Sequence, residues 1–327
     1  MGYCLQSGCN EYIWGNERPD FMPDTRNIGS YPPIIPLAVL FLFMIFASFI
    51  GQSLLFFLTD MAGFDIESLL TGQISDLPFG KRNLLRTFVL INHLFTFFVP
   101  AVLVGWMLMK RDCWRFLCLN RGIPLAAVGG AMFWMLLAFP LVQYVYWLNQ
   151  QVPLPAWALD IEKSTSKLVE MLLVMDSPIE MWFSLLVMAF IPALGEELFF
   201  RGIIQQTSEH FFKKPVMAVW LTAVIFSLFH FQFQGFVPRF LLGAMLGFLF
   251  YWSRNLWLSI AAHFFNNGIQ VIGAYYWKDQ LFASPESSQE QSVSWWLALL
   301  SLGFVLIGGS KLKTYFHNLR TESQAHD

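Results

Sequence analysis

Two carboxylates and one guanidinium lie within a single apolar stretch of this 327-residue chain, at Glu196, Glu197 and Arg201. Ionisable side chains are costly to bury in an apolar helix, so each one is a candidate for function. Glu197 and Arg201 are four residues apart and share a helix face, which allows a charge-assisted pair. Glu196 points about 100° away from Glu197 and lacks a local partner. We therefore expect Glu196 to face a cavity.

Two histidines and an asparagine follow in later apolar stretches. His230 lies four residues after Phe226, and Asn267 lies four residues after His263, so each pair shares one helix face. If these groups converge with Glu196 in a water-accessible pocket, they could activate water and stabilise an oxyanion. The pattern thus indicates hydrolytic chemistry.

Each of these residues also has a structural interpretation. Glu197 and Arg201 are favoured to be a pair that holds helices or a loop in place, and Glu196 could be a partner for Arg239 or for a histidine. A lone His230 would more often be a hydrogen-bonded packing residue, and His263 with Asn267 could bond helices together. Their joint occurrence on three helices favours function, because so many costly groups are unlikely to be kept for packing alone.

Other polar residues in apolar stretches are weaker candidates. Asn92 and His93 are interpreted as lining a polar interior or lying near an interface, and catalysis by His93 is not favoured. Arg239 could lie at a helix boundary with its charge in the interface, or it could pair with Glu196.

The composition indicates a membrane protein. Hydrophobic residues make up 56% of the chain and charged residues 13%, about half of the roughly 25% charge expected in a soluble domain. Long apolar stretches recur, which indicates contact with lipid rather than one oversized core. The formal net charge of −2 argues against a nucleic-acid partner, because no strongly basic surface is available for phosphates.

The fold class expected is all-α, a polytopic transmembrane bundle of about eight helices, because helices satisfy their own backbone groups in hydrocarbon. The expected spans are 34–58, 84–109, 123–148, 181–206, 215–233, 237–252, 255–276 and 293–310. They form one transmembrane domain at 34–310, between polar tails at 1–33 and 311–327. The amino end lacks the pattern of a cleavable signal peptide and is expected to be retained.

The basic residues of the connecting segments predict the orientation. Twelve Lys and Arg residues fall on one side and seven, including Arg82 and Arg86, on the other. This imbalance places both termini in the cytoplasm and the protein in the cell (inner) membrane. The connecting segments at 59–82 and 149–180 then lie outside, and the second is expected to be interfacial or re-entrant.

The depth of His230 conflicts with straight spans. A rise of 1.5 Å per residue places Glu196 roughly 16 Å and His230 roughly 22 Å from the cytoplasmic helix ends. A tilted helix, or one that begins below the membrane surface, would close this gap. We expect the boundary at 215 to be wrong.

In chain order the motifs read EExxxR, FxxxH and HxxxN, and all three are intact. They resemble those of the CAAX protease and bacteriocin-processing family of intramembrane proteases, which includes the type II CAAX prenyl endopeptidases. The resemblance covers about residues 180–275, where we expect the catalytic core. It implies a peptidase that cleaves a membrane-associated protein or peptide, which could be lipid-modified.

The resemblance also implies a role for each motif residue. Glu196 and His230 would activate a water molecule that attacks the peptide carbonyl, while His263 and Asn267 would stabilise the oxyanion. The supporting residues would be Glu197, Arg201 and Phe226.

A bound metal ion is left open. Zinc usually takes three protein ligands and a water, and Glu196, His230 and His263 could supply the three. The HExxH helix of many zinc proteases is absent. If His263 is instead an oxyanion donor, two ligands remain, so water activation without Zn²⁺ is slightly preferred.

The four cysteines form two pairs, Cys4 with Cys9 and Cys113 with Cys118, each with four residues between. A four-thiolate zinc site usually has tighter spacing, so unpaired reduced thiols are favoured.

Two other classes of function stay open. A catalytically silent binding or immunity-type membrane protein of the same fold would keep its binding or protection after Glu196→Gln. A proton-coupled transporter with a relay through Glu196 and the histidines is less favoured, because the sequence has no matching halves with broken helices.

Overall fold

The computed structural model describes residues 32, 34–61, 78–120, 122–277 and 293–325. All secondary structure in these segments is helical, as expected for an all-α bundle. Cys4, Cys9 and nearly all of the expected polar tail at 1–33 lie outside the described residues. Cys113 and Cys118 are buried and form no disulfide.

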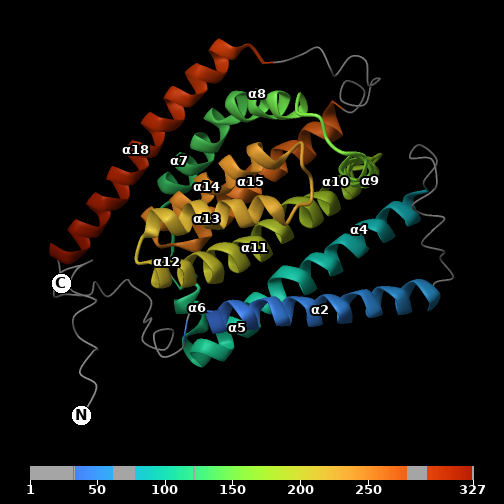
Figure 1. Ribbon diagram of the computed structural model, residues 1–327, viewed down its shortest axis with the longest axis horizontal. Coiled ribbons are helices and arrows are strands. Elements are labelled where there is room, and N and C mark those ends of the chain that lie inside the picture. The colour runs from blue at the N-terminus through green and yellow to red at the C-terminus, as the bar shows by residue number, and fades with distance from the viewer. Residues whose placement is uncertain (1–31, 33, 62–77, 121, 278–292, 326–327) are drawn as a thin grey trace.

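The first part of the chain forms two long rods and a bent helix pair (Figure 1). Their elements are α2 (Ile34–Met61), α4 (Phe79–His93), η3 (Leu94–Phe98), α5 (Val99–Met109), η4 (Lys110–Asp112), α6 (Cys113–Phe116), α7 (Leu125–Leu137) and α8 (Phe139–Gln150). Pro140 lies at the start of α8, where it cannot continue the hydrogen-bond pattern of α7, so the chain bends at this point.

The second part of the chain contains the motif-bearing helices. Its elements are α9 (Ala156–Leu173), α10 (Pro178–Leu185), η5 (Leu186–Phe190), α11 (Ile191–Glu197), η6 (Leu198–Gln205), α12 (Gln206–Phe212), α13 (Pro215–Leu228), α14 (Phe236–Ser253), α15 (Leu256–Tyr276) and α18 (Trp295–Ala325). The elements from α10 to α12 follow one another without a break and are called the central rod here.

The central rod lies in the middle of the bundle. In the most apolar 18-residue stretch of the central rod, 67% of the stretch is buried, against 22% in the corresponding stretch of α2 and 22% in that of the rod from α4 to α6. Phe199, Phe200 and Ile203 of the central rod are fully buried in the largest apolar cluster, where Val104 of α5 and Phe250 of α14 also lie. The other helices therefore surround the motif EExxxR and exclude water from most of it.

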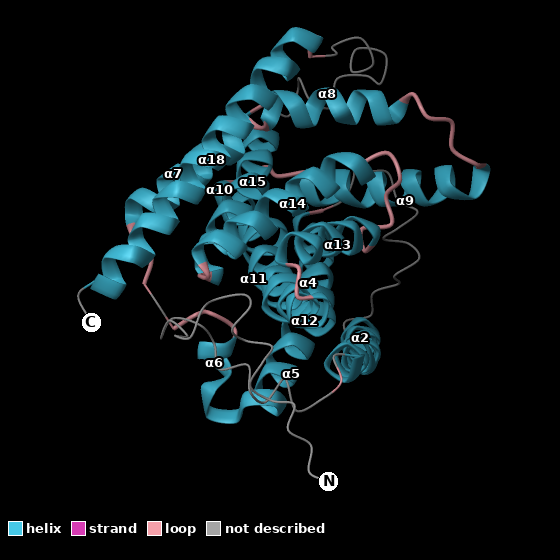
Figure 2. Ribbon diagram, turned by 60° about the vertical axis from the view of Figure 1, so that its left-hand side comes forward, coloured by secondary structure: helices cyan, strands magenta, loops and turns pink. Residues whose placement is uncertain are grey.

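The outer helices expose large apolar side chains. Phe46, Phe49 and Phe56 of α2 are each more than half exposed, and Figure 2 shows α2 at the edge of the bundle. A continuous apolar surface of this kind is stable against lipid but not against water. The outer surface therefore agrees with a membrane location.

Within the described part of the chain, six helical segments are long and apolar enough to cross a membrane. They are Ile34–Met61, Phe79–Phe116, Leu125–Gln150, Pro178–Phe212, Phe236–Ser253 and Trp295–Glu322. The other two expected spans also fall on helices, the shorter α13 and the more polar α15. The expected bundle is thus confirmed, with two of its eight helices less apolar or shorter than a usual span.

Several helix ends differ from the sequence expectations. The boundary at 215 is right, since α13 begins at Pro215, but the helix ends at Leu228 rather than 233. His230 therefore lies in the turn after this helix rather than within it. The segment 149–180 contains a complete helix, α9, and α18 continues through most of the expected polar tail at 311–327.

Candidate active site

The carboxyl group of Glu196 is buried and only partly bonded. Its side chain lies near the end of α11 and Glu196 is 5% exposed. Oε1 lies 3.3 Å from Nε2 of His93. Oε2 has no hydrogen-bond partner among the described residues and lies 4.0 Å from Nε2 of His263. One carboxylate oxygen is therefore buried and free to accept a hydrogen bond.

Glu197 is fully buried and joins the motif EExxxR to α15. Its Oε1 accepts from Nη1 of Arg201 at 2.6 Å and lies 2.8 Å from Nδ1 of His263. Arg201 also donates through Nη2 to the carbonyl of Gly243 at 2.8 Å. The expected pair of Glu197 with Arg201 is present, and through it His263 is oriented with Nε2 towards Glu196.

His230 lies in the turn after α13. Its Nδ1 is 2.9 Å from the carbonyl oxygen of Phe226. Because a carbonyl can only accept, this contact places a proton on Nδ1 and leaves Nε2 as an acceptor in the neutral ring. Within the described part of the chain, no hydrogen bond occupies Nε2, so it could accept a hydrogen bond from water.

The Phe226 ring packs against three site residues. Its centroid lies 4.9 Å from that of His230 and 5.9 Å from that of His263, both edge to face. The guanidinium of Arg201 lies 4.8 Å from the same centroid. A Cβ on Gly243 would lie 2.9 Å from Cδ1 of Phe226, so α14 can pack this closely only because that residue is glycine. Phe226 thus supports both imidazoles.

Asn267 is placed differently from the other motif residues. Its Nδ2 donates to the carbonyl of Met188 at 3.4 Å, and in the described residues it makes no hydrogen bond to Glu196 or His263. Pro192 explains this contact, because it has no N–H to offer the carbonyl four residues earlier. The amide of Asn267 would have to leave this carbonyl, or share its second N–H, to bind an oxyanion.

His93 contacts Glu196 although the sequence did not favour it for catalysis. Its ring packs 5.6 Å from that of Phe97, and its Nδ1 is buried without a partner among the described residues. A Cβ on Gly195 would lie 3.4 Å from both Cβ of Phe97 and N of Phe98, so a larger residue would crowd this approach. The expectation that His93 faces a polar interior is right.

Widened π-type turns begin close to both residues of this contact, η3 directly after His93 and η6 two residues after Glu196. Such turns occur often at functional sites, where they redirect side chains within a helix. Gly195 and the placement of a histidine in an apolar helix were the sequence signals that could have identified His93.

The described side chains do not form the zinc site that the sequence left open. Among the residues that the structure describes, no three His, Cys, Asp or Glu side chains are arranged to hold a metal ion. Glu196 and His263 approach each other, but Nδ1 of His263 is taken by Glu197 and Nδ1 of His230 by a backbone carbonyl. The geometry therefore offers no support for Zn²⁺ at Glu196, His230 and His263.

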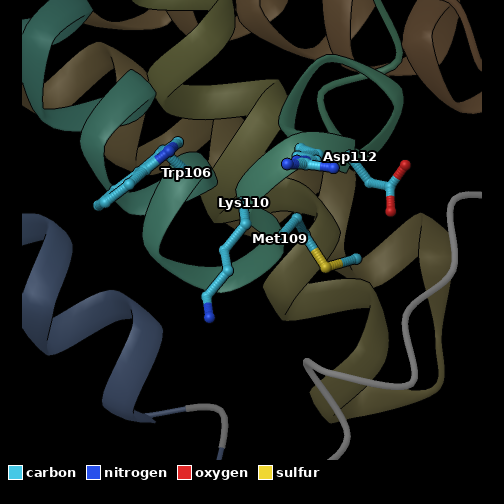
Figure 3. A pocket seen from close by; sticks show the side chains of 5 residues that line it. Trp106, Met109, Lys110 and Asp112 are labelled. Atoms are coloured by element: carbon cyan, nitrogen blue, oxygen red, sulfur yellow. The ribbon is translucent and has the colours of Figure 1, made fainter.

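Two cavities lie outside this cluster. A cleft of about 780 Å³ between α2, α4 and α9 is lined by mostly apolar residues and by Gln52, Ser53 and Asn92. Asn92 directly precedes His93 in α4, but neither His93 nor any of the motif residues lines this cleft. A second cavity of about 450 Å³ lies at the turn after α5 (Figure 3), and its lining includes no site residue.

Comparison with known proteins supports the motifs. Residues 178–269 match the family described as "Type II CAAX prenyl endopeptidase Rce1-like", which confirms the resemblance to CAAX proteases stated from the motifs. No curated protein and no solved structure matches the chain. The family is one of proteases, and together with the apolar helices it indicates an integral membrane protein that acts on a peptide or protein. His93 lies outside the matched segment.

Proposed function

We propose that this chain is an intramembrane endopeptidase that hydrolyses a peptide bond of a membrane-associated protein or peptide. The match of residues 178–269 to a protease family supports the class of reaction. The observation that carries the mechanism is the half-bonded carboxylate of Glu196, with Oε1 against His93 and Oε2 open beside His263. A buried carboxylate with an open oxygen can take a proton from water.

In the proposed reaction Glu196 accepts a proton from a water molecule through Oε2. The water oxygen forms a bond to the peptide carbonyl carbon, and Nε2 of His230 accepts a hydrogen bond from the second water proton. When the carbon–nitrogen bond breaks, the protonated Glu196 gives its proton to the leaving nitrogen. The products are a carboxylic acid and an amine, and the carboxylate is restored.

The oxyanion of the intermediate would be held by His263 and Asn267. Since Nδ1 of His263 faces Glu197, Nε2 can donate only when the ring carries both protons. The charged pair of Glu197 with Arg201 would keep that ring in place. Asn267 would donate an N–H after its contact with Met188 loosens.

The substrate would reach the site within the membrane. The mostly apolar cleft between α2, α4 and α9, whose lining includes the neighbour of His93 in the chain, Asn92, would be the approach for a membrane-embedded or lipid-modified peptide. The beginning of α2 and the end of α18 lie on the same side of the bundle (Figure 1). This arrangement agrees with both termini in the cytoplasm, in the cell membrane.

The substitution Glu196→Gln tests the reaction, because it keeps the side-chain shape and removes the base. The protein would be reconstituted in liposomes with a fluorogenic CAAX peptide, in farnesylated and unmodified forms. Cleavage is expected to fall by about 10³-fold, while Glu170→Gln, which changes an exposed glutamate of α9, should cleave like the wild type. A chelator should leave wild-type cleavage unchanged.

A silent binding protein of the same fold gives a different result. Peptide would then bind to the wild type and to Glu196→Gln with equal affinity, and neither would cleave it. Cleavage that survives in Glu196→Gln would overturn the mechanism proposed for this residue.

A further inference from the structure

The loop that carries His230 contains a strained backbone. It joins α13 to α14, and Phe231, the residue after His230, has φ 51°. A bulky residue in this left-handed region costs free energy and persists only where surrounding contacts impose it. The contacts that hold this loop therefore decide where the imidazole of His230 lies.

Two side chains from α8 and α9 hold the loop. Asn149 of α8 donates through Nδ2 to the carbonyl oxygens of Phe233 at 2.7 Å and of Gln234 at 2.6 Å. Glu162 of α9 accepts from the backbone N–H of Phe233 at 2.9 Å. The loop backbone is thus bonded on both its donor and its acceptor sides, and the Phe233 ring packs 5.3 Å from that of Trp157.

The loop is also held from α14. Arg239 donates through Nη1 to the carbonyl of Gln232 at 3.1 Å and also bonds the side-chain oxygen of that residue. The sequence had suggested that Arg239 either lies at the interface or pairs with Glu196. Instead its guanidinium bonds Gln232 of the loop from α14, the helix that follows the loop.

We infer that Asn149 and Glu162 are positioning residues that set the place of His230 for the reaction. Both lie before the segment 178–269 that matches the protease family, so the family core would depend on α8 and α9 for its geometry. Glu162 is 8% exposed, and its carboxyl oxygen serves as an acceptor inside the bundle. The inference rests on the proposed function, because it assigns His230 a part in hydrolysis.

One of the two side chains donates its hydrogen bonds and the other accepts, so substitutions of matched size can test each role separately. Asn149 must donate, so Asn149→Asp keeps the size and removes both bonds to carbonyl oxygens. Glu162 must accept, so Glu162→Gln keeps an acceptor oxygen while Glu162→Ala loses it. We expect kcat to fall about tenfold in Asn149→Asp and Glu162→Ala, with KM little changed, and Glu162→Gln to retain kcat within about threefold. Asn318→Asp, at an exposed position of α18, is the matched control.

Hydrogen exchange at the Phe233 amide provides a readout that does not need catalysis. Exchange is expected to be faster in Glu162→Ala than in the wild type, and unchanged in Glu162→Gln. A loss of kcat in Glu162→Gln equal to that in Glu162→Ala would overturn the inference, as would wild-type kcat in Asn149→Asp. If the wild type cleaves no peptide, the proposed function fails, and the exchange pattern alone decides whether Glu162 holds the loop.

Discussion

Two buried glutamates on the central rod differ in how completely they are bonded. Glu180, at the start of α10, accepts on Oε1 from Arg82 at 2.8 Å and from Arg86 at 2.9 Å. Its Oε2 accepts from Arg82 at 3.0 Å and from the backbone N–H of Asp176 at 3.0 Å. Glu196, four turns later, has one contact at 3.3 Å and one open oxygen. The first carboxylate is saturated, and the second is not.

Both glutamates face the same neighbouring helix. Arg82 and Arg86 lie near the start of α4 and His93 at its end, so α4 meets the central rod at two levels. At the first level two guanidiniums compensate the buried charge and fix the helices together. At the second level the helices bring His93 and Glu196 together, but Nδ1 of His93 and Oε2 of Glu196 have no hydrogen-bond partner among the described residues. The comparison teaches that the fully bonded Glu180 can hold the helices together, while the partly bonded Glu196 keeps an oxygen free for a reaction.

Removing the charge of Glu180 should have the largest effect on stability. Glu180→Gln leaves the buried guanidinium of Arg86 without a carboxylate and leaves Arg82 with only the half-exposed Asp176, so unfolding should become easier by about 3–5 kcal/mol. Thermal unfolding in detergent micelles, followed by tryptophan fluorescence, measures this change. Molecules that remain folded should still cleave peptide, because the substitution is remote in sequence from the site.

Glu196→Gln is the matched variant on the same rod. It should unfold at or above the wild-type temperature, because a buried and partly bonded carboxylate is costly and its removal relieves that cost. A loss of stability as large as that of Glu180→Gln would mean that Glu196 is a structural residue, and the comparison would fail.

His93 offers a test of the partial bond itself. His93→Phe keeps a ring beside Phe97 and removes the contact to Oε1 of Glu196. A hydrogen bond to a charged group typically contributes about 1.5–3 kcal/mol, so kcat is expected to fall roughly tenfold to hundredfold. Initial rates of peptide cleavage measure this.

The variant His93→Gln separates hydrogen bonding from packing at this position. Its amide can still donate to Glu196, so part of the rate should return. Equal rates in His93→Phe and in the wild type would show that the contact has no part in catalysis, and equal rates in the Phe and Gln variants would assign the loss to packing.

Local spacing determined which parts of this arrangement the sequence could predict. The pair of Glu197 with Arg201 follows from a separation of four residues in one helix, and the structure contains it. The contact of His93 with Glu196 spans 103 residues, so it depends on how two helices pack and on the absence of a side chain at Gly195. No periodicity within one helix encodes such a contact.

The same limit applies to the saturated cluster. Arg82 and Arg86 were counted as charges of a connecting segment, but both are buried and bonded to a glutamate more than 90 residues away. The end of α13 was also missed, because the residues from Phe229 to Phe233 remain apolar enough to continue a span. The helices and the local pair of Glu197 with Arg201 could be predicted, and the contacts between distant helices could not.

Asp176→Asn should have the smallest effect, and it isolates burial from bonding. Asp176 pairs with Nη2 of Arg82 at 2.8 Å, as close as the bond from the same guanidinium to Glu180, but its side chain is 57% exposed. Water screens an exposed pair, so the loss should stay below about 1 kcal/mol. The backbone N–H of Asp176, which bonds Glu180, is unchanged by this substitution. Asp176→Asn should therefore lose much less free energy of unfolding than Glu180→Gln when the two are measured side by side. Equal losses would mean that bond length, rather than burial, decides how much each carboxylate contributes to stability.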